Sequence, residues 1–331
     1  MNFPKVIKNG VEFRKDPLTL EESRLNPARA KRVKPAVTEE GLTQLVNNSK
    51  HDCPFCPEVI LDKTPLLPER VSRGGRIREG SALLFPNKNP FSENHVVIVL
   101  GELHYQTLDE LSEKTIENAL IASQKYIEAV YKDNRKARIP IILWNYMPPS
   151  AGSIIHPHIQ LLIEEKPPLG LKKYLNKSKK FYEKQRKSYW EDLVITEKQL
   201  DERFIGETNH FSIIASFAPR GFNEIQFIFK NISSLCHVNK QGIQEFSRYL
   251  RKALRCYNTM GVGSFNLISY SSPTGEYLPY FPLSFKLISR PFPSEIYTND
   301  TGPLERLYDT WVVDTLPEEV AQTMKHYFHH S

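Results

Sequence analysis

The sequence predicts an α+β fold in which an antiparallel sheet carries packed helices, built from two similar units. Two observations lead to this prediction. Short apolar segments with the alternation of strands are interleaved with two long amphipathic helices. The same order of elements then occurs a second time along the 331 residues, a length that suits about two domains of ~150 residues each.

The predicted elements follow one another in the same order in both halves. In the first half they are strands at residues 81–86 and 95–100, a helix at 108–131, and strands at 139–145 and 154–163. In the second half they are strands at 211–217 and 224–229, a helix at 240–257, and strands at 264–270 and 282–288. An internal duplication explains this order.

The last strands of the two halves can be aligned through their prolines. HPHIQLLI at residues 156–163 then faces FPLSFKLI at residues 281–288. Under this alignment the second half has apolar side chains where the first half has reactive ones. The pairs are His156 with Phe281, His158 with Leu283, and Gln160 with Phe285. The second unit is therefore predicted to be non-catalytic and to complete the sheet or shape the pocket.

The order of elements divides the chain into four parts. Residues 1–50 carry many charges and few apolar runs, so we expect an extended arm laid over the core. Residues 51–170 form the first, catalytic unit and residues 204–331 the second. The basic stretch 171–203 has helical spacing and connects them.

Composition excludes several classes of protein. With 40% hydrophobic and 25% charged residues, the chain is typical of a soluble globular protein. It has no apolar run of the roughly 18 residues that a membrane span needs, and MNFPKVIKNG lacks a secretory apolar stretch, so we expect a cytoplasmic protein. The net charge is +6, but the densest basic run, residues 172–187, resembles a solvated helix face. No nucleic-acid partner is therefore predicted, and the charge suits phosphates.

Residues 156–160, HPHIQ, give the first chemical signal. Side chains alternate between the faces of a strand, so His156, His158 and Gln160 share one face while Pro157 and Ile159 point the other way. A lone strand histidine is most often a surface residue. Two imidazoles and an amide opposite an apolar face are typical of a functional site, because the apolar face sets the register.

CPFC at residues 53–56 gives the second signal. Two thiolates separated by two residues can both reach one zinc ion at ~2.3 Å. A redox pair is the competing interpretation, but no helix pattern begins at Cys56 and Pro57 follows it directly. Zinc needs two further ligands, for which His104 and His156 are the best candidates among ten histidines, although His51 is closer in sequence.

Taken together, the motifs resemble the galactose-1-phosphate uridylyltransferase family, the transferase branch of the histidine-triad superfamily, which also includes ADP-glucose and dinucleotide phosphorylases. HPHIQ looks like the family's HPHxQ signature. Three other segments agree in order with the family, and the resemblance covers roughly residues 12–165 well. These segments are FRKDPLTLEESRLNPARAKRVKP at 13–35, FPNKNP at 85–90 and LGELHYQTLDELS at 100–112.

The resemblance implies a role for each matching residue. His158 is the expected nucleophile, and Gln160 is expected to donate to phosphoryl oxygens. Zinc is the expected cofactor, with Cys53, Cys56, His104 and His156 as its four ligands. The expected substrate contacts are Arg29, Arg32, Asn87, Asn145, Ser153 and Glu305. The segment RAKR at residues 29–32 would by itself indicate a basic surface patch. Because the other motifs of the family are also present, we assign its two arginines to phosphate binding.

Several positions depart from the family pattern. Gly152 stands one place later than the family's glycine, and Trp144 replaces an acidic residue found in some relatives. In GPLERLYDTW at 302–311, Glu305 matches the hexose-binding stretch, but Leu304 and Trp311 replace a tyrosine and a glutamine. The residues for the nucleotide donor are therefore complete, whereas those for the acceptor are not.

The resemblance implies nucleotidyl transfer, with UMP moved from a nucleotide sugar to a sugar 1-phosphate through a nucleotidyl-histidine. Two alternatives stay open. In the first, the protein is an ADP-sugar or dinucleotide phosphorylase, in which inorganic phosphate accepts the nucleotide from the same histidine. In the second, it is a zinc-stabilised nucleotide-binding protein without turnover. The expected partners are a nucleotide sugar and a sugar phosphate or phosphate, and the resemblance also implies a homodimer.

Overall fold

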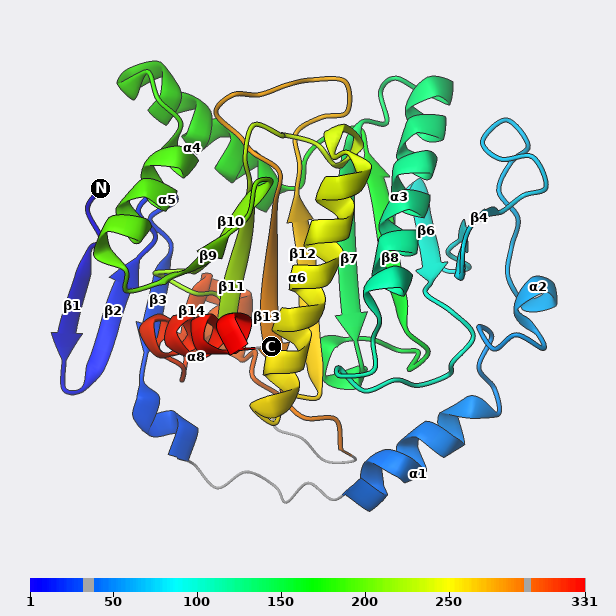
Figure 1. Cartoon of the computed structure of the whole chain (residues 1–331), viewed down its shortest axis with the longest axis horizontal. Coiled ribbons are helices and arrows are strands. Elements are labelled where there is room, and N and C mark those ends of the chain that lie inside the picture. The colour runs from blue at the N-terminus through cyan, green and yellow to red at the C-terminus, as the bar shows by residue number, and fades with distance from the viewer. Residues whose placement is uncertain (32–38, 295–298, 331) are drawn as a thin grey trace.

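A ten-stranded antiparallel sheet forms the centre of the described chain in the computed structural model, which covers residues 1–31, 39–294 and 299–330 (Figure 1). The strands lie in an order that is mirrored about the β7–β12 pair. In that order they are β4 (Ile77–Glu79), β5 (Ala82–Pro86), β6 (Asn94–Val99), β8 (His158–Glu164), β7 (Ile139–Tyr146), β12 (Ser264–Tyr270), β13 (Ser284–Arg290), β11 (Phe222–Phe229), β10 (Phe211–Ala215) and β9 (Phe204–Glu207).

The described helices lie on both faces of this sheet and at its ends. They are α1 (Glu39–Lys50), α2 (Ile60–Lys63), α3 (Glu113–Asp133), α4 (Leu169–Gln185), α5 (Tyr189–Leu200), α6 (Lys240–Thr259), α7 (Pro303–Tyr308) and α8 (Pro317–His330), with short 3-10 turns η1 (Pro27–Lys31), η2 (Pro148–Ser150) and η3 (Leu235–His237). The predicted α+β class is confirmed, as are both long helices. The first begins later than predicted because Ser112 caps it, its hydroxyl accepting from the amide of Thr115.

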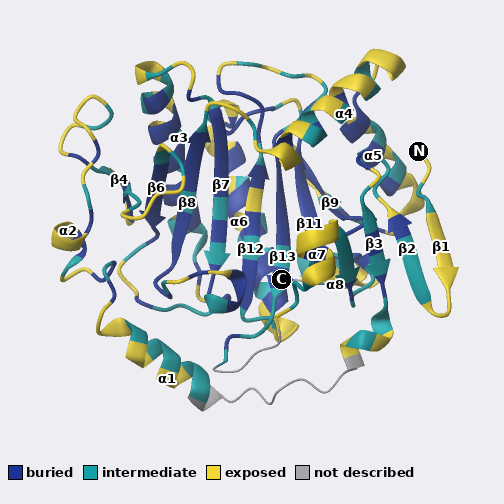
Figure 2. Ribbon diagram, turned by 180° about the vertical axis from the view of Figure 1, so that it is seen from behind, coloured by how far each residue is buried: buried dark blue, intermediate teal, exposed yellow. Residues whose placement is uncertain are grey.

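One face of the sheet is covered by α3, α6 and α8 (Figure 1). The main core lies there, because alternate strand residues such as Ile159, Leu161 and Phe285 point toward these helices. On the opposite face, α4 and α5 pack on residues of β7, β8, β10 and β11 such as Ile141 and Leu162, and the Cys53–Cys56 segment packs near β5 and β6. Between these segments the ribbon of β12 includes an exposed stretch, coloured yellow in Figure 2. Ile268, on this strand, is 40% exposed. Part of this face, at β12, is therefore exposed, and we refer to the whole of it as the open face.

The N-terminal segment differs from the expected extended arm. Its residues form β1 (Lys5–Lys8), β2 (Val11–Lys15) and β3 (Glu22–Leu25), which join β14 (Thr310–Val313) in a second sheet. β14 pairs in parallel with β3, so the two ends of the chain meet in this sheet. These strands were not predicted from the sequence. Every residue of β1 is exposed, so this strand lacks the apolar alternation of a half-buried strand.

The alignment of Pro157 with Pro282 was wrong by one residue. Leu283 and Phe285 point toward α6, where the rings of Phe285 and Phe246 lie 4.4 Å apart. His158 and Gln160 point to the opposite face, on which the second half has Ser284 and Lys286. A shift of one residue reverses every side chain of a strand. The boundaries of the two units stay a prediction.

Candidate active site

His158 is the first residue of β8, on the open face of the sheet. Its Nδ1 donates a 2.8 Å hydrogen bond to the main-chain oxygen of His156, two residues earlier. This bond places the proton on Nδ1 and leaves the lone pair on Nε2, which has no hydrogen-bond partner among the described residues. Burial lowers the pKa of His158, although the bond to the His156 carbonyl opposes the shift. The site thus presents a nitrogen lone pair at Nε2 of His158.

Gln160 follows on the same face and touches a residue that the motifs did not predict. Nε2 of the buried His95, on the neighbouring β6, lies 2.8 Å from its Oε1, and Nδ2 of Asn87 lies 3.5 Å from the same oxygen. The amide of Phe91 donates to Nδ1 of His95, so Nε2 of His95 donates to Gln160. The amide oxygen of Gln160 is thereby engaged, and its NH₂ group points away from His95.

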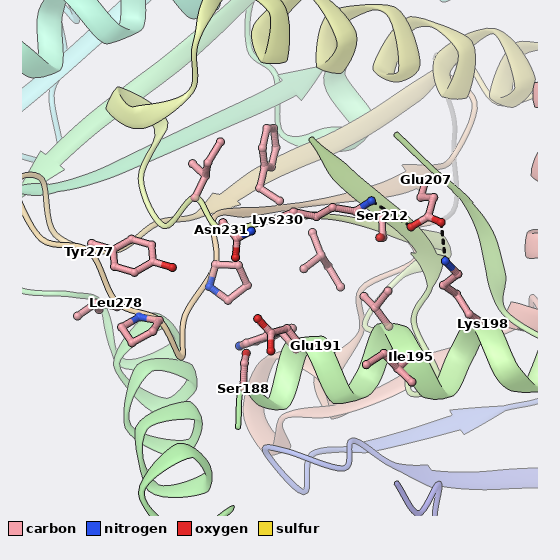
Figure 3. Close-up of a pocket in the computed structure, with 17 residues that line it drawn as sticks. Ser188, Glu191, Ile195, Lys198, Glu207, Ser212, Lys230, Asn231, Tyr277 and Leu278 are labelled. Carbon is pink, nitrogen blue, oxygen red and sulfur yellow. Dashed lines mark hydrogen bonds and ion pairs between the residues drawn. The ribbon is translucent and has the colours of Figure 1, made fainter. Parts of the chain in front are cut away.

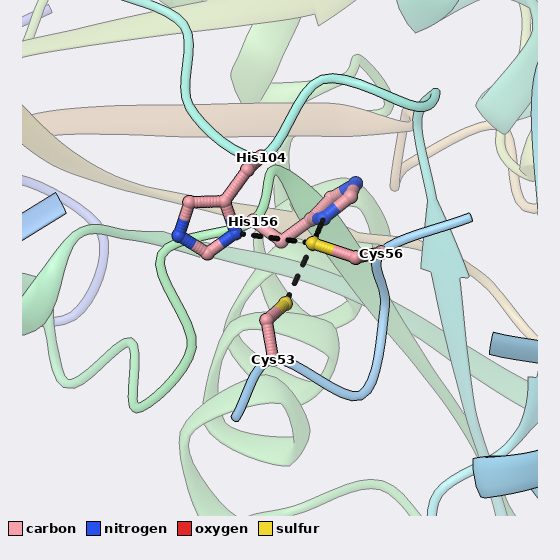
Figure 4. A group of neighbouring side chains, drawn as sticks. All are labelled: Cys53, Cys56, His104 and His156. Carbon is pink, nitrogen blue, oxygen red and sulfur yellow. Dashed lines mark hydrogen bonds between the residues drawn. The ribbon is translucent and has the colours of Figure 1, made fainter. Parts of the chain in front are cut away.

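Cys53, Cys56, His104 and His156 form a buried cluster whose ligand atoms all lie within 4.8 Å of one another (Figure 4). His156 Nε2 donates to the carbonyl of Gly101 over 2.8 Å, so its Nδ1 lone pair faces both sulfur atoms, at 3.8 and 3.9 Å. Two cysteines and two histidines at this spacing can hold a metal ion.

The second histidine of the cluster is oriented in the same way. His104 Nδ1 lies 3.5 Å from the sulfur of Cys56, and its Nε2 lies 2.9 Å from the hydroxyl of Ser49. That hydroxyl donates to the carbonyl of Val46, so it accepts from His104 and leaves the Nδ1 lone pair toward the cluster. Such outer hydrogen bonds are typical of metal-binding imidazoles. Burial and the neighbouring Cys53 raise the pKa of the Cys56 thiol to about 11, so a bound cation is what would stabilise its thiolate.

Phe55, between the two cysteines, connects this cluster to His158. Its ring meets the rings of His158 and His156 edge-on, with centroids 5.2 and 6.3 Å away, and also contacts Phe85. The loop that carries Cys53 and Cys56 therefore forms one wall around the His158 imidazole.

Asn145 and Ser153 flank a tight loop that leads into β8. Met147 and Ala151 adopt positive φ angles of 70° and 68°, which cost a non-glycine residue roughly 1–3 kcal/mol each and gather at functional sites. A side chain at Gly152 would come within 2.7 Å of the carbonyl of Asn145, which explains the glycine here. The loop leaves Asn145 half-buried on the open face and Ser153 exposed.

Comparison with known proteins identifies the fold. No family model matches the chain. An uncharacterised protein of Archaeoglobus fulgidus is 29% identical over 325 residues, 97% of this chain and 93% of that protein. An ADP-glucose phosphorylase from Arabidopsis thaliana, solved with bound ADP-glucose, superimposes with a TM-score of 0.73 at 19% identity, covering 95% of this chain and 98% of that one. A GalT-like protein from the same plant gives 0.71 at 19% identity with the same coverage.

A solved uridylyltransferase gives a TM-score of 0.68 at 19% identity and covers 96% of this chain and 98% of its own. The chain has the fold of the galactose-1-phosphate uridylyltransferase family. This agrees with the resemblance that the motifs indicated. Among the residues that the structure describes, no helix has the length and apolar character to cross a membrane.

Two described residues that were predicted as substrate contacts, Arg29 and Glu305, make no contact with His158 in this fold. Arg29 lies in η1, beyond β3, and Arg32 lies outside the described residues. Glu305 has a structural task instead: its two carboxylate oxygens accept from the main-chain amides of Gly302 and Val312, and its side chain is buried. Assigning Glu305 to a hexose is a prediction that this geometry disfavours.

A separate cavity of about 340 Å³ lies between α5 and the loop at residues 277–282 (Figure 3). Lys198, Glu207 and Lys230 form a chain of ion pairs beside it, and most of its wall is apolar. None of the predicted site residues lines it. The cavity is therefore distinct from the candidate site, which is an open face of the sheet.

Trp144, which replaces an acidic residue of some relatives, points away from the site. It is fully buried on the helix-covered side of β7, where its ring meets that of Phe265 edge-on. His95 is the site residue that sequence reasoning missed. Its only signal was a histidine at the start of a predicted strand, and its partner Gln160 is 65 residues away.

Proposed function

We propose that this protein is a nucleotidyltransferase that carries a nucleoside monophosphate, UMP by the resemblance, on His158 between a nucleotide sugar and a phosphate-bearing acceptor. The observation that carries the proposal is the hydrogen bond from Nδ1 of His158 to the His156 carbonyl, which leaves the Nε2 lone pair free to act as the nucleophile. The fold shared with uridylyltransferases and ADP-glucose phosphorylase supports the reaction class.

The chemistry balances without a separate general base. Nε2 of His158 forms a bond to the α-phosphorus of the donor, and the bond from that phosphorus to the bridging oxygen breaks. The electron pair leaves with the sugar 1-phosphate. The imidazole keeps its Nδ1 proton and becomes cationic, and the carbonyl of His156 stabilises that charge. A phosphate oxygen of the acceptor then attacks the phosphorus and restores neutral His158.

The surrounding residues fit this step. Gln160, with its oxygen engaged by His95, has an NH₂ group to donate to phosphoryl oxygens as their charge grows. We assign Asn145, Ser153 and Asn87 to the nucleotide. The resemblance adds Arg29 and Arg32 as phosphate contacts, since planar guanidinium groups bind phosphate oxygens in pairs.

We assign zinc to the cluster of Cys53, Cys56, His104 and His156. The donor set and the two outward hydrogen bonds of its histidines support this metal. Four protein ligands leave no open position, so the ion would order the loop that carries Phe55 rather than take part in the transfer. Its role is then to hold the walls around His158.

The acceptor has two candidates, and Glu305 decides which one we favour. A sugar 1-phosphate is the acceptor by the resemblance, but the one residue that matched the hexose-binding stretch is engaged by two main-chain amides. Inorganic phosphate needs no contacts to sugar hydroxyls. We therefore favour phosphorolysis of a nucleotide sugar, with hexose 1-phosphate as the alternative.

The test is to incubate the protein with α-labelled UDP-glucose or ADP-glucose and look for a covalent protein adduct. Phosphoimidazoles are stable in base and labile in acid, so an acid-labile label is expected. Protein that binds the nucleotide but acquires no label under any of these conditions would be a nucleotide-binding protein without turnover, and the proposed function would be wrong.

A further inference from the structure

Asn266, in the second half of the chain, lies directly opposite Asn145 across the β7–β12 pair. Both side chains lie on the open face, because the adjacent residues Trp144 and Leu267 are buried in the helix-covered core. Nδ2 of Asn266 donates to Oδ1 of Asn145 over 2.7 Å. This contact joins the two halves at the nucleotide end of the candidate site.

The neighbours of Asn266 determine which way its amide faces. Nδ2 also lies 2.9 Å from the main-chain oxygen of Ser150, which can only accept. Oδ1 lies 2.9 Å from Nη1 of Arg290, which can only donate. An amide turned over would meet an acceptor with its oxygen and a cation with its NH₂ group. Asn266 therefore has one favourable orientation.

Arg290 is itself held in place. Its Nη2 donates to the carboxylate of Asp300 over 2.6 Å, and the side chains of Arg290 and Asp300 are only 15% and 8% exposed. A charge-assisted bond in such a setting is stronger than one between neutral groups. The order Asp300, Arg290, Asn266, Asn145 is thus a chain of hydrogen bonds that runs from the second half of the molecule to the first.

The last hydrogen bond in this series, from Asn266 to Asn145, determines which end of the Asn145 amide faces the site. Because Asn266 presents an N–H, Asn145 must present its oxygen to it, so the NH₂ group of Asn145 turns elsewhere. That group has no hydrogen-bond partner among the described residues, and Asn145 is half-buried on the open face. An NH₂ group donates to phosphate or ribose oxygens, whereas an amide oxygen would repel a phosphate.

We propose that Asn266 and Arg290 are positioning residues that hold the NH₂ group of Asn145 toward the bound nucleotide, so that the second half serves the site of the first. This rests on the proposed function. A structural role alone explains the pair poorly, because two β-branched side chains at a central cross-strand position would stabilise the sheet at least as well. Asn266 also donates to the main-chain oxygen of Ser150, in the loop before Ser153. It therefore positions both the Asn145 side chain and this loop, which we assign to the nucleotide.

The experiment is a double-mutant cycle between Asn266→Leu and Asn145→Ala. Leucine has the same number and branching of side-chain heavy atoms as asparagine, and it adds no charge that would repel a phosphate. Measured as kcat/KM for loading of His158 from a labelled nucleotide sugar, Asn266→Leu is expected to cost about 10- to 100-fold, the range of a lost hydrogen bond that orients a buried amide. In the Asn145→Ala background the same change should cost less than about threefold, because coupled residues are not additive.

Matched variants separate positioning from stability. Ser284→Ala removes a hydrogen bond to Gln226 within the second half and leaves the chain to Asn145 intact, so its activity should equal that of the wild type. Asn266→Ala is the second variant should leucine prevent folding. Equal losses from the Asn266 change in both backgrounds, with a matching fall in Tm, would show a structural role and overturn the proposal.

The result for the wild type tells the two proposals apart. If the wild type acquires no label, the same four proteins of the cycle are compared by their Kd for UMP and AMP, which needs no transfer. Coupling of Asn266 and Asn145 in Kd then supports the positioning role while the proposed transfer fails. If the changes in binding free energy from the two substitutions are additive, or if the wild type binds no nucleotide, the positioning role is overturned.

Discussion

The main-chain oxygen of His156 accepts a hydrogen bond from Nδ1 of His158, while the imidazole of His156 faces the sulfur atoms of Cys53 and Cys56. One residue thus joins the metal cluster and sets the tautomer of the proposed nucleophile. Phe55 closes the connection from the other side by packing on both histidine rings. Because of this coupling, the nucleophile and the cluster must be tested by variants that separate them.

Replacing the nucleophile is expected to abolish transfer without loss of the metal. In His158→Ala the attacking nitrogen is missing, so neither a labelled adduct nor exchange between a nucleotide sugar and a labelled sugar phosphate should be detected, a loss of about 10⁴-fold or more. Metal content and folding should persist, because His158 is not one of the four residues of the cluster. His51→Ala is the control, since that side chain is 89% exposed and pairs only with Asp52. Full exchange by folded His158→Ala would contradict the mechanism.

Metal analysis should find about one zinc ion per chain. Cys53→Ser removes one of four ligands, and a structural zinc ion stabilises folding by several kcal/mol, so we expect loss of the metal and a fall in Tm of roughly 10 °C. Cys236→Ser is the matched control, because Cys236 is half-buried in η3 and lies outside the cluster. A purified protein that is free of metal and loses no stability with a chelator would show that the cluster is not a metal site.

The local pattern of the first half predicted most of this arrangement. Alternation in HPHIQ placed His158 and Gln160 on one face, and period-two and helical patterns gave the sheet strands and both long helices. The alignment with the second half failed because similar residue types do not define the register of a strand. Ser284 and Lys286, both buried, lie on the same face as His158 and Gln160, where Leu283 and Phe285 were expected.

Other features depend on contacts that no local pattern contains. Ser49 orients His104 from α1, and β14 joins β3 from the far end of the chain. The hydrogen bonds from Arg290 to Asn266 and on to Asn145 connect residues whose separate sequence contexts say nothing of one another. Such relationships appear only when the fold brings the residues together.

Glu318, on α8, should make the stability depend on acid pH. It pairs with the buried Arg14 of β2 at 2.9 Å and with Arg203 at 2.8 Å. Burial by itself raises the pKa of Glu318, but the hydrogen bonds and charges of Arg14 and Arg203 outweigh it and lower the pKa to about 2. A carboxylate with a lowered pKa stabilises the fold above its unfolded pKa of ~4.5, and that stability is lost as the pH falls from there toward 2.

Glu318→Gln should therefore lower the free energy of unfolding by about 2–3 kcal/mol at pH 7, a range that allows for the partial exposure of Glu318. The substitution removes a negatively charged partner from two buried guanidinium groups, those of Arg14 and Arg203. Urea unfolding at pH 7, 5 and 3.5 checks this, and the difference from the wild type should shrink as the pH falls. Glu22→Gln, which breaks the exposed pair with Arg24, is the control and should change stability by less than about 0.5 kcal/mol. A difference that stays constant with pH would show that the charge of Glu318 is not what stabilises the contact.

The last prediction concerns the preferred acceptor, and it follows from the engagement of Glu305 by two main-chain amides. We expect kcat/KM for inorganic phosphate to exceed that for galactose 1-phosphate by at least about tenfold, since sugar hydroxyls buried without partners cost ~1–3 kcal/mol each. Both acceptors, with glucose 1-phosphate, should be compared using UDP-glucose and ADP-glucose as donors. Glu305→Gln separates the two roles of this residue. If Glu305 only holds the amides of Gly302 and Val312, the variant loses about 1 kcal/mol of stability and its preference among acceptors is unchanged. A wild type that prefers galactose 1-phosphate, together with a Glu305→Gln variant that loses this preference, would show that Glu305 binds the hexose after all.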